Sequence, residues 1–161
     1  MRSEVADDFA VWVSPHLTSM GYLAARLVGD ADRDDVVQEA LSRAWRKRHT
    51  FDPGRGTPRA WLLAIVADRG RRHRGRRRPV EPMNAAGVDR LSVPSADGTR
   101  VDLERAVQAL PERMRLAIDC VYFVGLSVAE TATVMNVAEG TVKSTLHDAR
   151  ARLRRMLEVT P

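Results

Sequence analysis

The stretch SVAETATVMNVAEGTVKSTLHDARARL, residues 127–153, decides the fold of the second half of the chain. Its apolar residues recur at three- and four-residue spacing, which predicts a short helix, a turn at Asn136 and a longer helix. Asparagine tolerates the left-handed backbone conformation that such a turn requires. Ala132 is a small residue where the two helices would cross, and Val142 is a β-branched residue that would fill the space beneath the second helix. The pattern is typical of a helix-turn-helix.

The first turns of the longer helix are rich in polar side chains, as expected of a helix that enters the major groove of DNA. Lysine and arginine suit phosphates, whereas serine, threonine and histidine can contact base edges. The alternative is a helical hairpin that packs and binds nothing. The residues expected on the exposed side are Thr141, Lys143, Ser144, Thr145, His147 and Asp148, with Arg150 close by.

Helical periodicity extends through most of the 161 residues, and aromatic residues make up only 5%. This balance favours helices over a sandwich or barrel, so the predicted fold class is all-α. Pro15 is expected to kink or divide the first helical segment. The predicted helices are 4–28, 30–48, 58–78, 101–109, 111–124, 127–135 and 139–157.

The second predicted helix has one apolar face and one polar face. Asp30 or Asp32 can cap its start, and Asp34 and Asp35 suit its first turn, where negative charge is favourable. The apolar face contains Val36, Val37, Ala40, Leu41, Ala44 and Trp45. The polar face includes Asp35, Gln38, Glu39 and Arg43, and is free to meet solvent or a partner.

The third predicted helix follows a loop, FDPGRGTP, and begins near Pro58, whose fixed φ suits a first turn. Its first half is apolar, and Trp61 is interpreted as a core residue rather than a platform for a base. Its second half is rich in arginine and is interrupted by Gly70 and Gly75, each of which costs about 1 kcal/mol relative to alanine. We therefore expect this end to be frayed until an anion orders it.

The chain has 26 Lys and Arg residues against 21 Asp and Glu residues, which gives a formal charge of +5. The excess is +6 in residues 1–80 and −1 in residues 81–161, and seven arginines lie between Arg69 and Arg78. So dense a run favours contact with phosphate or with an acidic surface over a merely solvated face.

Residues 79–100 contain three prolines and two glycines without sustained periodicity, and are predicted to be a flexible linker. The expected organisation is therefore a helical domain at 1–78, the linker at 79–100 and a second helical domain at 101–161.

Several classes of protein are disfavoured. No apolar run reaches the ~18 residues of a membrane span, and the acidic N-terminus does not resemble a secretory signal, so we expect a cytoplasmic protein without membrane insertion. The lone Cys120 is interpreted as a buried core thiol. The four histidines lack metal-ligand spacing and no catalytic motif is present, so we expect neither enzymatic activity nor a metal or cofactor.

Three segments together resemble the extracytoplasmic-function group of sigma-70 family RNA polymerase sigma factors: DDVVQEALSRAW (34–45), FDPGRGTPRAWLLAI (51–65) and the stretch from Leu110 to Leu157. The resemblance implies sigma domain 2, then sigma domain 4 with its helix-turn-helix. It also implies core RNA polymerase, promoter DNA and an anti-sigma factor as partners, and we expect no homo-oligomer. An autonomous helix-turn-helix regulator is the alternative; it leaves the polar face of residues 35–43 and the arginine run without a joint role.

The resemblance also assigns roles to residues. Asp35, Gln38, Glu39 and Arg43 would bind core polymerase. Asp68, Arg69, Arg71, Arg72, Arg74 and Arg76 would contact the minus-ten element, and Thr141, Lys143, Ser144, Thr145, His147 and Arg150 the minus-thirty-five element.

The sequence departs from the family pattern at three of the DNA-facing positions. Asp68 replaces a usual asparagine, and its carboxylate would repel phosphate or accept a hydrogen bond from cytosine or from a neighbouring arginine. Thr145 and Asp148 stand where arginine is common, so the second domain is expected to make fewer phosphate contacts and to bind DNA with less sensitivity to salt.

Overall fold

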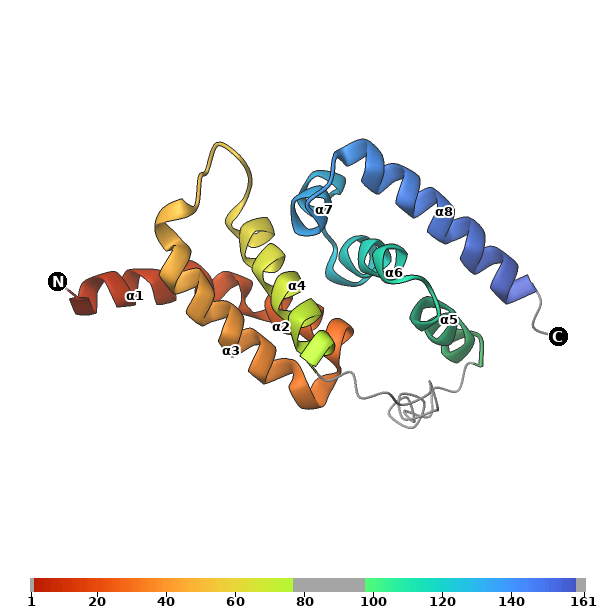
Figure 1. Ribbon diagram of the computed structural model, residues 1–161, viewed down its shortest axis with the longest axis horizontal. Coiled ribbons are helices and arrows are strands. Elements are labelled where there is room, and N and C mark those ends of the chain that lie inside the picture. Colours follow the sequence, from red (N-terminus) through yellow and green to blue (C-terminus); the bar gives the residue numbers. More distant parts are fainter. Residues whose placement is uncertain (1, 77–97, 159–161) are drawn as a thin grey trace.

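The structure is a computed structural model that describes residues 2–76 and 98–158, and every regular element in these ranges is helical (Figure 1). The all-α prediction is confirmed. The α-helices are α1 (Arg2–Val13), α2 (Leu17–Val28), α3 (Asp30–Lys47), α4 (Pro58–Arg76), α5 (Gly98–Gln108), α6 (Glu112–Ile118), α7 (Val128–Met135) and α8 (Glu139–Glu158). Short 3-10 turns occupy Ser14–His16 and Arg48–Thr50, and a π-helical segment, Asp119–Val124, continues α6.

The first domain is formed by α1 to α4. The 3-10 turn that contains Pro15 divides α1 from α2, as predicted. Helices α2, α3 and α4 pack against one another around fully buried side chains, and each buried leucine or methionine contributes about 1.5–3 kcal/mol. These side chains are Met20, Leu23, Val36, Ala40, Leu62, Leu63 and Val66.

The start of α3 differs from the prediction. Its N-cap is Gly29, with φ 83°, and no side chain caps the helix, so neither Asp30 nor Asp32 has that role. Gly29 also ends α2, because its N–H donates to the Ala25 carbonyl at 2.9 Å. One glycine thus serves both helices and leaves no separate capping position. Asp30 and Asp32, rather than Asp34 and Asp35, lie in the first turn.

The second domain is formed by α5 to α8 and contains the predicted helix-turn-helix. Ser127 caps α7 through a capping box with Glu130, and α7 ends at Asn136 in the left-handed conformation, with φ 55°. Val142 is fully buried on the inner side of α8, and Ala132 is buried where α7 meets the domain core. These features confirm the motif.

The predicted helix limits agree with the structure to within three residues at most ends. Helix α5 begins at Gly98, so the last three residues of the predicted linker are helical. The rest of the predicted linker, residues 79–97, lies outside the described residues. The arginine-rich end of α4 is helical as far as Arg76, and Arg77 and Arg78 are also outside the described residues.

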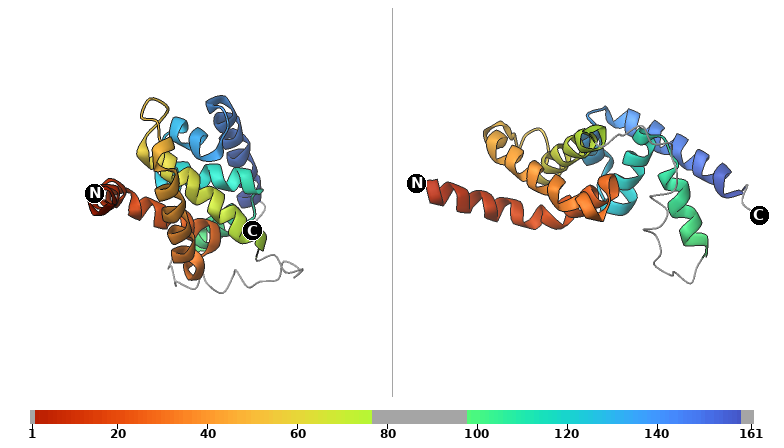
Figure 2. Two further views of the ribbon diagram at one scale, coloured as in Figure 1. Left: turned by 60° about the vertical axis from the view of Figure 1, so that its left-hand side comes forward. Right: turned by 60° about the horizontal axis from the view of Figure 1, so that its bottom comes forward.

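The two domains pack directly against each other. Helix α7 lies against α4, and the π-helical segment lies against α2; the two views in Figure 2 show the same neighbours. Cys120, Leu126 and Val134 of the second domain are buried in one apolar cluster with residues of α2, α3 and α4. A continuous core therefore crosses the domain boundary.

Gly70 gives a stability prediction. A Cβ at this position would lie 2.9 Å from Leu27 Cδ1 and 3.2 Å from Leu27 Cβ, whereas a Cβ at Gly75 would meet nothing within 4 Å. Gly70→Ala should destabilise the protein by about 1–3 kcal/mol through overpacking. Gly75→Ala, the matched control, should stabilise it by up to about 1 kcal/mol through helix propensity. Urea unfolding of both variants measures the difference, and equal stabilisation would contradict the Gly70 contact.

Candidate nucleic-acid interface

Helix α8 presents most of its predicted DNA-contacting residues to solvent. Lys143, Ser144, His147 and Arg150 are exposed, and Thr141 and Thr145 are half-buried. The opposite side of the helix is anchored in the domain core by Val142, Leu146 and Ala149. The structure therefore brings the predicted residues together along one accessible stretch of α8. This helix lies at the outer edge of the second domain (Figure 1).

Two of these side chains already have partners within the domain. The Ser144 hydroxyl donates to the Thr141 carbonyl at 3.0 Å, which leaves its oxygen as an acceptor. Arg150 Nε donates to the Tyr122 hydroxyl at 2.8 Å, and its guanidinium lies 5.8 Å from the centre of the Tyr122 ring. Tyr122 was not predicted to support this surface, because its segment reads as an apolar core run; the π-helical turn leaves it 56% exposed.

The arginine run of α4 does not form one uniform surface. Arg71, Arg72 and Arg76 are exposed, whereas Arg69 and Arg74 are partly buried. Arg76 Nη2 donates to Glu39 at 3.3 Å, and Arg74 Nη2 pairs with Glu112 of the second domain at 2.5 Å. The run thus divides between solvent and acidic partners.

Asp68 binds arginines of its own helix. Its Oδ2 lies 2.7 Å from Arg69 Nη2 and 3.4 Å from Arg72 Nε. Burial alone would raise the pKa of Asp68, but the two arginines outweigh burial and hold that pKa below its usual value. A contact with a neighbouring arginine was one of the predicted outcomes for this carboxylate.

A hollow of about 350 Å³ opens between α3 and α4 beside Asp68. Its wall combines cationic side chains with apolar ones, which is the combination that binds single-stranded nucleic acid through phosphate contacts and stacking. It brings together residues that were predicted separately for polymerase and for DNA. The principal lining residues are Arg43, Lys47, Trp61, Ile65, Asp68 and Arg72.

Trp61 is part of an aromatic cluster next to this hollow. Its ring centre lies 5.8 Å from that of Trp12 and 5.7 Å from that of Phe51, and both pairs are edge-on. Phe9 and Trp45 extend the cluster. Trp61 is half-buried and packs against the core, as interpreted from the sequence, but its side chain also forms part of the wall of the hollow.

The polar face of α3 lies opposite the buried Val36, Ala40 and Ala44. Asp35 and Gln38 are exposed. Glu39 and Arg43 are half-buried, because Arg76 contacts Glu39 and Arg43 borders the hollow. The four predicted residues share one side of the helix, as their spacing requires.

A buried carboxylate, Asp119, lies where the two domains meet. Its Oδ1 accepts a hydrogen bond from Arg26 Nε at 2.8 Å, while its Oδ2 has no hydrogen-bond partner. Burial raises the pKa of Asp119 to about 6, against the opposing effect of Arg26. The adjacent Cys120 is also buried and free, as predicted, and burial raises its pKa to about 12.

The family models agree with this two-domain arrangement. Residues 12–79 match Sigma-70 region 2, and residues 100–153 match Sigma-70, region 4. The chain is 35% identical to the ECF RNA polymerase sigma factor EcfG of Rhodopseudomonas palustris, over 88% of this chain and 80% of the relative. It is 34% identical to the ECF RNA polymerase sigma factor SigL of Mycobacterium tuberculosis, over 89% of this chain and 85% of the relative.

Two solved structures resemble the whole chain. CnrH in complex with the cytosolic domain of CnrY matches with a TM-score of 0.70 and 26% identity, over 95% of this chain and 89% of that chain. The sigma factor RpoE in complex with the anti-sigma factor NepR, from Bartonella quintana, matches with a TM-score of 0.68 and 28% identity, over 96% of this chain and 99% of that chain.

The fold and the exposed recognition helix thus define a two-domain DNA-binding protein with sigma-70 regions 2 and 4. The chain belongs to the extracytoplasmic-function RNA polymerase sigma factors. It is accordingly a transcription initiation factor that acts with core RNA polymerase at promoter DNA, and an autonomous regulator is not favoured.

Asp119 gives a pH prediction. The Asp119 carboxyl group binds its proton more tightly in the folded chain than in the unfolded chain, where its pKa is near 3.8. The contribution of Asp119 to stability is therefore fully present below about pH 4 and is lost as the pH rises through about 6, a change of about 3 kcal/mol.

Urea unfolding of the wild type and of Asp119→Asn across this range should give profiles that diverge as the pH rises. Asp7→Asn, at an exposed position, is the control and should run parallel to the wild type. Parallel profiles for all three proteins would show that Asp119 keeps an ordinary pKa.

Proposed function

We propose that the polar face of α3, formed by Asp35, Gln38, Glu39 and Arg43, binds core RNA polymerase. Support comes from its position within the region 2 match and from its exposure opposite a buried apolar face. The face mixes both signs of charge with an amide, which suits a specific protein partner better than a polyanion.

The minus-ten element is assigned to α4 and the adjoining hollow. The exposed Arg71 and Arg72 would hold phosphates, and the hollow would receive part of a separated strand. Asp68 would act mainly by orienting Arg69 and Arg72, since its carboxylate already binds both. The remaining members of the set, Arg74 and Arg76, would exchange their acidic partners for phosphate.

The minus-thirty-five element is assigned to α8. Lys143 and Arg150 would contact phosphates, and Ser144 and His147 would face base edges, because these four side chains are exposed on a helix held by the helix-turn-helix. Thr141 and Thr145 are half-buried, so they would make fewer contacts with the DNA than the four exposed side chains, and these contacts would lie closer to the helix backbone.

An anti-sigma factor is proposed as a further partner. The two similar solved structures are complexes, one with the cytosolic domain of CnrY and one with the anti-sigma factor NepR. Among the described helices, none has the length and hydropathy that crossing a membrane demands. We place the protein in the cytoplasm, where polymerase and promoter DNA are found, and assign it no catalytic activity of its own.

Polymerase binding can be tested on α3. Asp35→Arg combined with Gln38→Ala should abolish co-elution with core polymerase, because it reverses a charge and removes an amide on the proposed contact face. The circular dichroism spectrum should stay unchanged, since both side chains are exposed. Asp7→Arg, which makes the same charge change outside the region 2 match, should bind normally. Normal co-elution of the double variant would assign polymerase binding elsewhere.

DNA contact can be tested on α4. Arg71→Ala combined with Arg72→Ala should lower open-complex formation more than core binding, and should reduce the salt slope by about 0.7 per lost contact to a single strand. Arg105→Ala with Arg113→Ala removes two exposed arginines from the second domain and is the control. Equal losses of core binding and open complex would argue against the assignment of α4 to DNA.

A further inference from the structure

Three arginines of the first domain form ion pairs with acidic residues of the second. The most buried of these contacts surrounds Arg26 of α2. Its Nη1 lies 2.6 Å from Glu104, its Nε lies 2.8 Å from Asp119, and its guanidinium lies 3.8 Å from the centre of the Phe123 ring. All three partners belong to the second domain, so a single side chain fastens α2 to α5 and to the π-helical segment.

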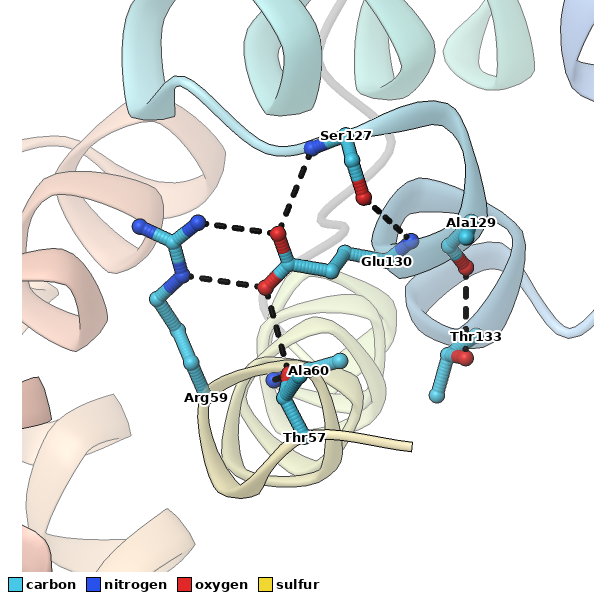
Figure 3. Close-up of polar contacts among 7 residues, drawn as sticks. All are labelled: Thr57, Arg59, Ala60, Ser127, Ala129, Glu130 and Thr133. Carbon is cyan, nitrogen blue, oxygen red and sulfur yellow. Dashed lines mark hydrogen bonds and ion pairs between the residues drawn. The ribbon is translucent and has the colours of Figure 1, made fainter. Parts of the chain in front are cut away.

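The second contact joins α4 to the helix-turn-helix. Figure 3 shows both oxygens of Glu130 facing Arg59, with Nε at 3.1 Å and Nη2 at 2.9 Å. Thr57 donates to the same carboxylate at 3.2 Å. This fork geometry is the strong form of an arginine–carboxylate pair, and the hydrogen bond from Arg59 lowers the pKa of Glu130.

The third contact is the pair between Arg74 and Glu112, near the other end of α4. In all three contacts the cation comes from the first domain and the acid from the second. The net charges of the two halves of the sequence, +6 for residues 1–80 and −1 for residues 81–161, differ in the same direction. Part of the basic excess is therefore neutralised within the chain.

Apolar side chains are also buried where the two domains meet. Leu126 is 4% exposed and Val134 is 3% exposed, and both share a cluster with first-domain residues. Exposed ion pairs alone contribute little, but these pairs surround a buried apolar interface. The closed arrangement is thus a specific packed state.

We propose that this closed arrangement is autoinhibited: the acidic side chains of the second domain hold the first domain in cis, and one of them, Glu112, competes with nucleic acid for Arg74. The proposal rests on the function proposed above. Arg74 belongs to the set assigned to the minus-ten element, and in the closed chain it is occupied by Glu112. Contact of α7 with α4 also fixes α8 relative to α4, so the two DNA-binding helices cannot be placed independently.

A reversible disulfide tests the proposal directly. A Cβ at Gly56, in the loop before α4, would lie 3.9 Å from Thr133 Oγ1 of α7, so side chains at these two positions would be in direct contact. The native Cys120 is buried and does not compete. Gly56→Cys with Thr133→Cys should therefore cross-link on oxidation and lock the chain closed.

The oxidised double variant should bind promoter DNA and initiate transcription with core polymerase at least about tenfold less well than the reduced form. The wild type and the two single-cysteine variants should respond equally with and without reductant. Equal activity of the oxidised and reduced forms would overturn the proposal, and so would failure of the disulfide to form, since residues 56 and 133 would then not meet.

Charge reversal provides an independent test. Arg59→Glu should open the chain by repelling Glu130, raising the radius of gyration in solution X-ray scattering. It should also increase the affinity of the free protein for promoter DNA by about threefold or more, although it makes the chain more acidic. Arg33→Glu, which makes the same charge change at a surface pair with Asp34, should stay compact and bind DNA more weakly.

Arg59→Lys, which keeps the positive charge opposite Glu130, should keep the compact form. If Arg59→Glu instead stays compact and loses DNA affinity as Arg33→Glu does, the proposal is wrong. The proposed function is judged separately, by whether the wild type and the reduced double-cysteine variant initiate with core polymerase. Closure itself is measured without polymerase, by cross-linking and scattering.

Discussion

The burial of α4 is the constraint on which the rest of the structure depends. Its residues Leu62, Leu63 and Val66 are fully buried, and the helix packs against α2, α3 and α7. The close approach at Gly70 shows how little room this packing leaves. Because the same helix also carries the arginines, the core of the first domain determines which of them face solvent and which face the second domain.

Local sequence patterns predicted the features that depend on local chemistry. Periodicity identified the helices, Asn136 was expected at the left-handed turn, and Val142 was expected beneath α8; all three are confirmed. The prediction for the start of α3 was wrong, because Gly29 is shared by α2 and α3 and leaves no position for the aspartate cap that the sequence suggests. The cost assigned to Gly70 omitted its contact with Leu27, since no local pattern reveals which side chain approaches a helix.

The contact between the domains could not be predicted because its partners are distant in sequence. Arg59 and Glu130 are 71 positions apart, and Arg26 and Asp119 are 93 apart. The unequal charge of the two halves was a hint, because the arginine run was expected to contact phosphate or an acidic surface, but nothing local showed that an acidic surface would be the second domain of the same chain. Some of the residues assigned to polymerase and promoter are exposed and others are half-buried. Their roles stay predictions, because the partners that would identify them are separate molecules.

Glu130 has two tasks that a single substitution cannot separate. Its carboxylate accepts from the Ser127 amide to complete the capping box of α7, and it also receives the fork of Arg59 (Figure 3). A change at Glu130 therefore weakens the start of a helix as well as the contact between domains, whereas a change at Arg59 weakens the contact and leaves the capping box in place. Selection for folding acts on Glu130, which completes the capping box of α7, but not on Arg59. We therefore expect related chains to vary more often at the position of Arg59 than at the position of Glu130.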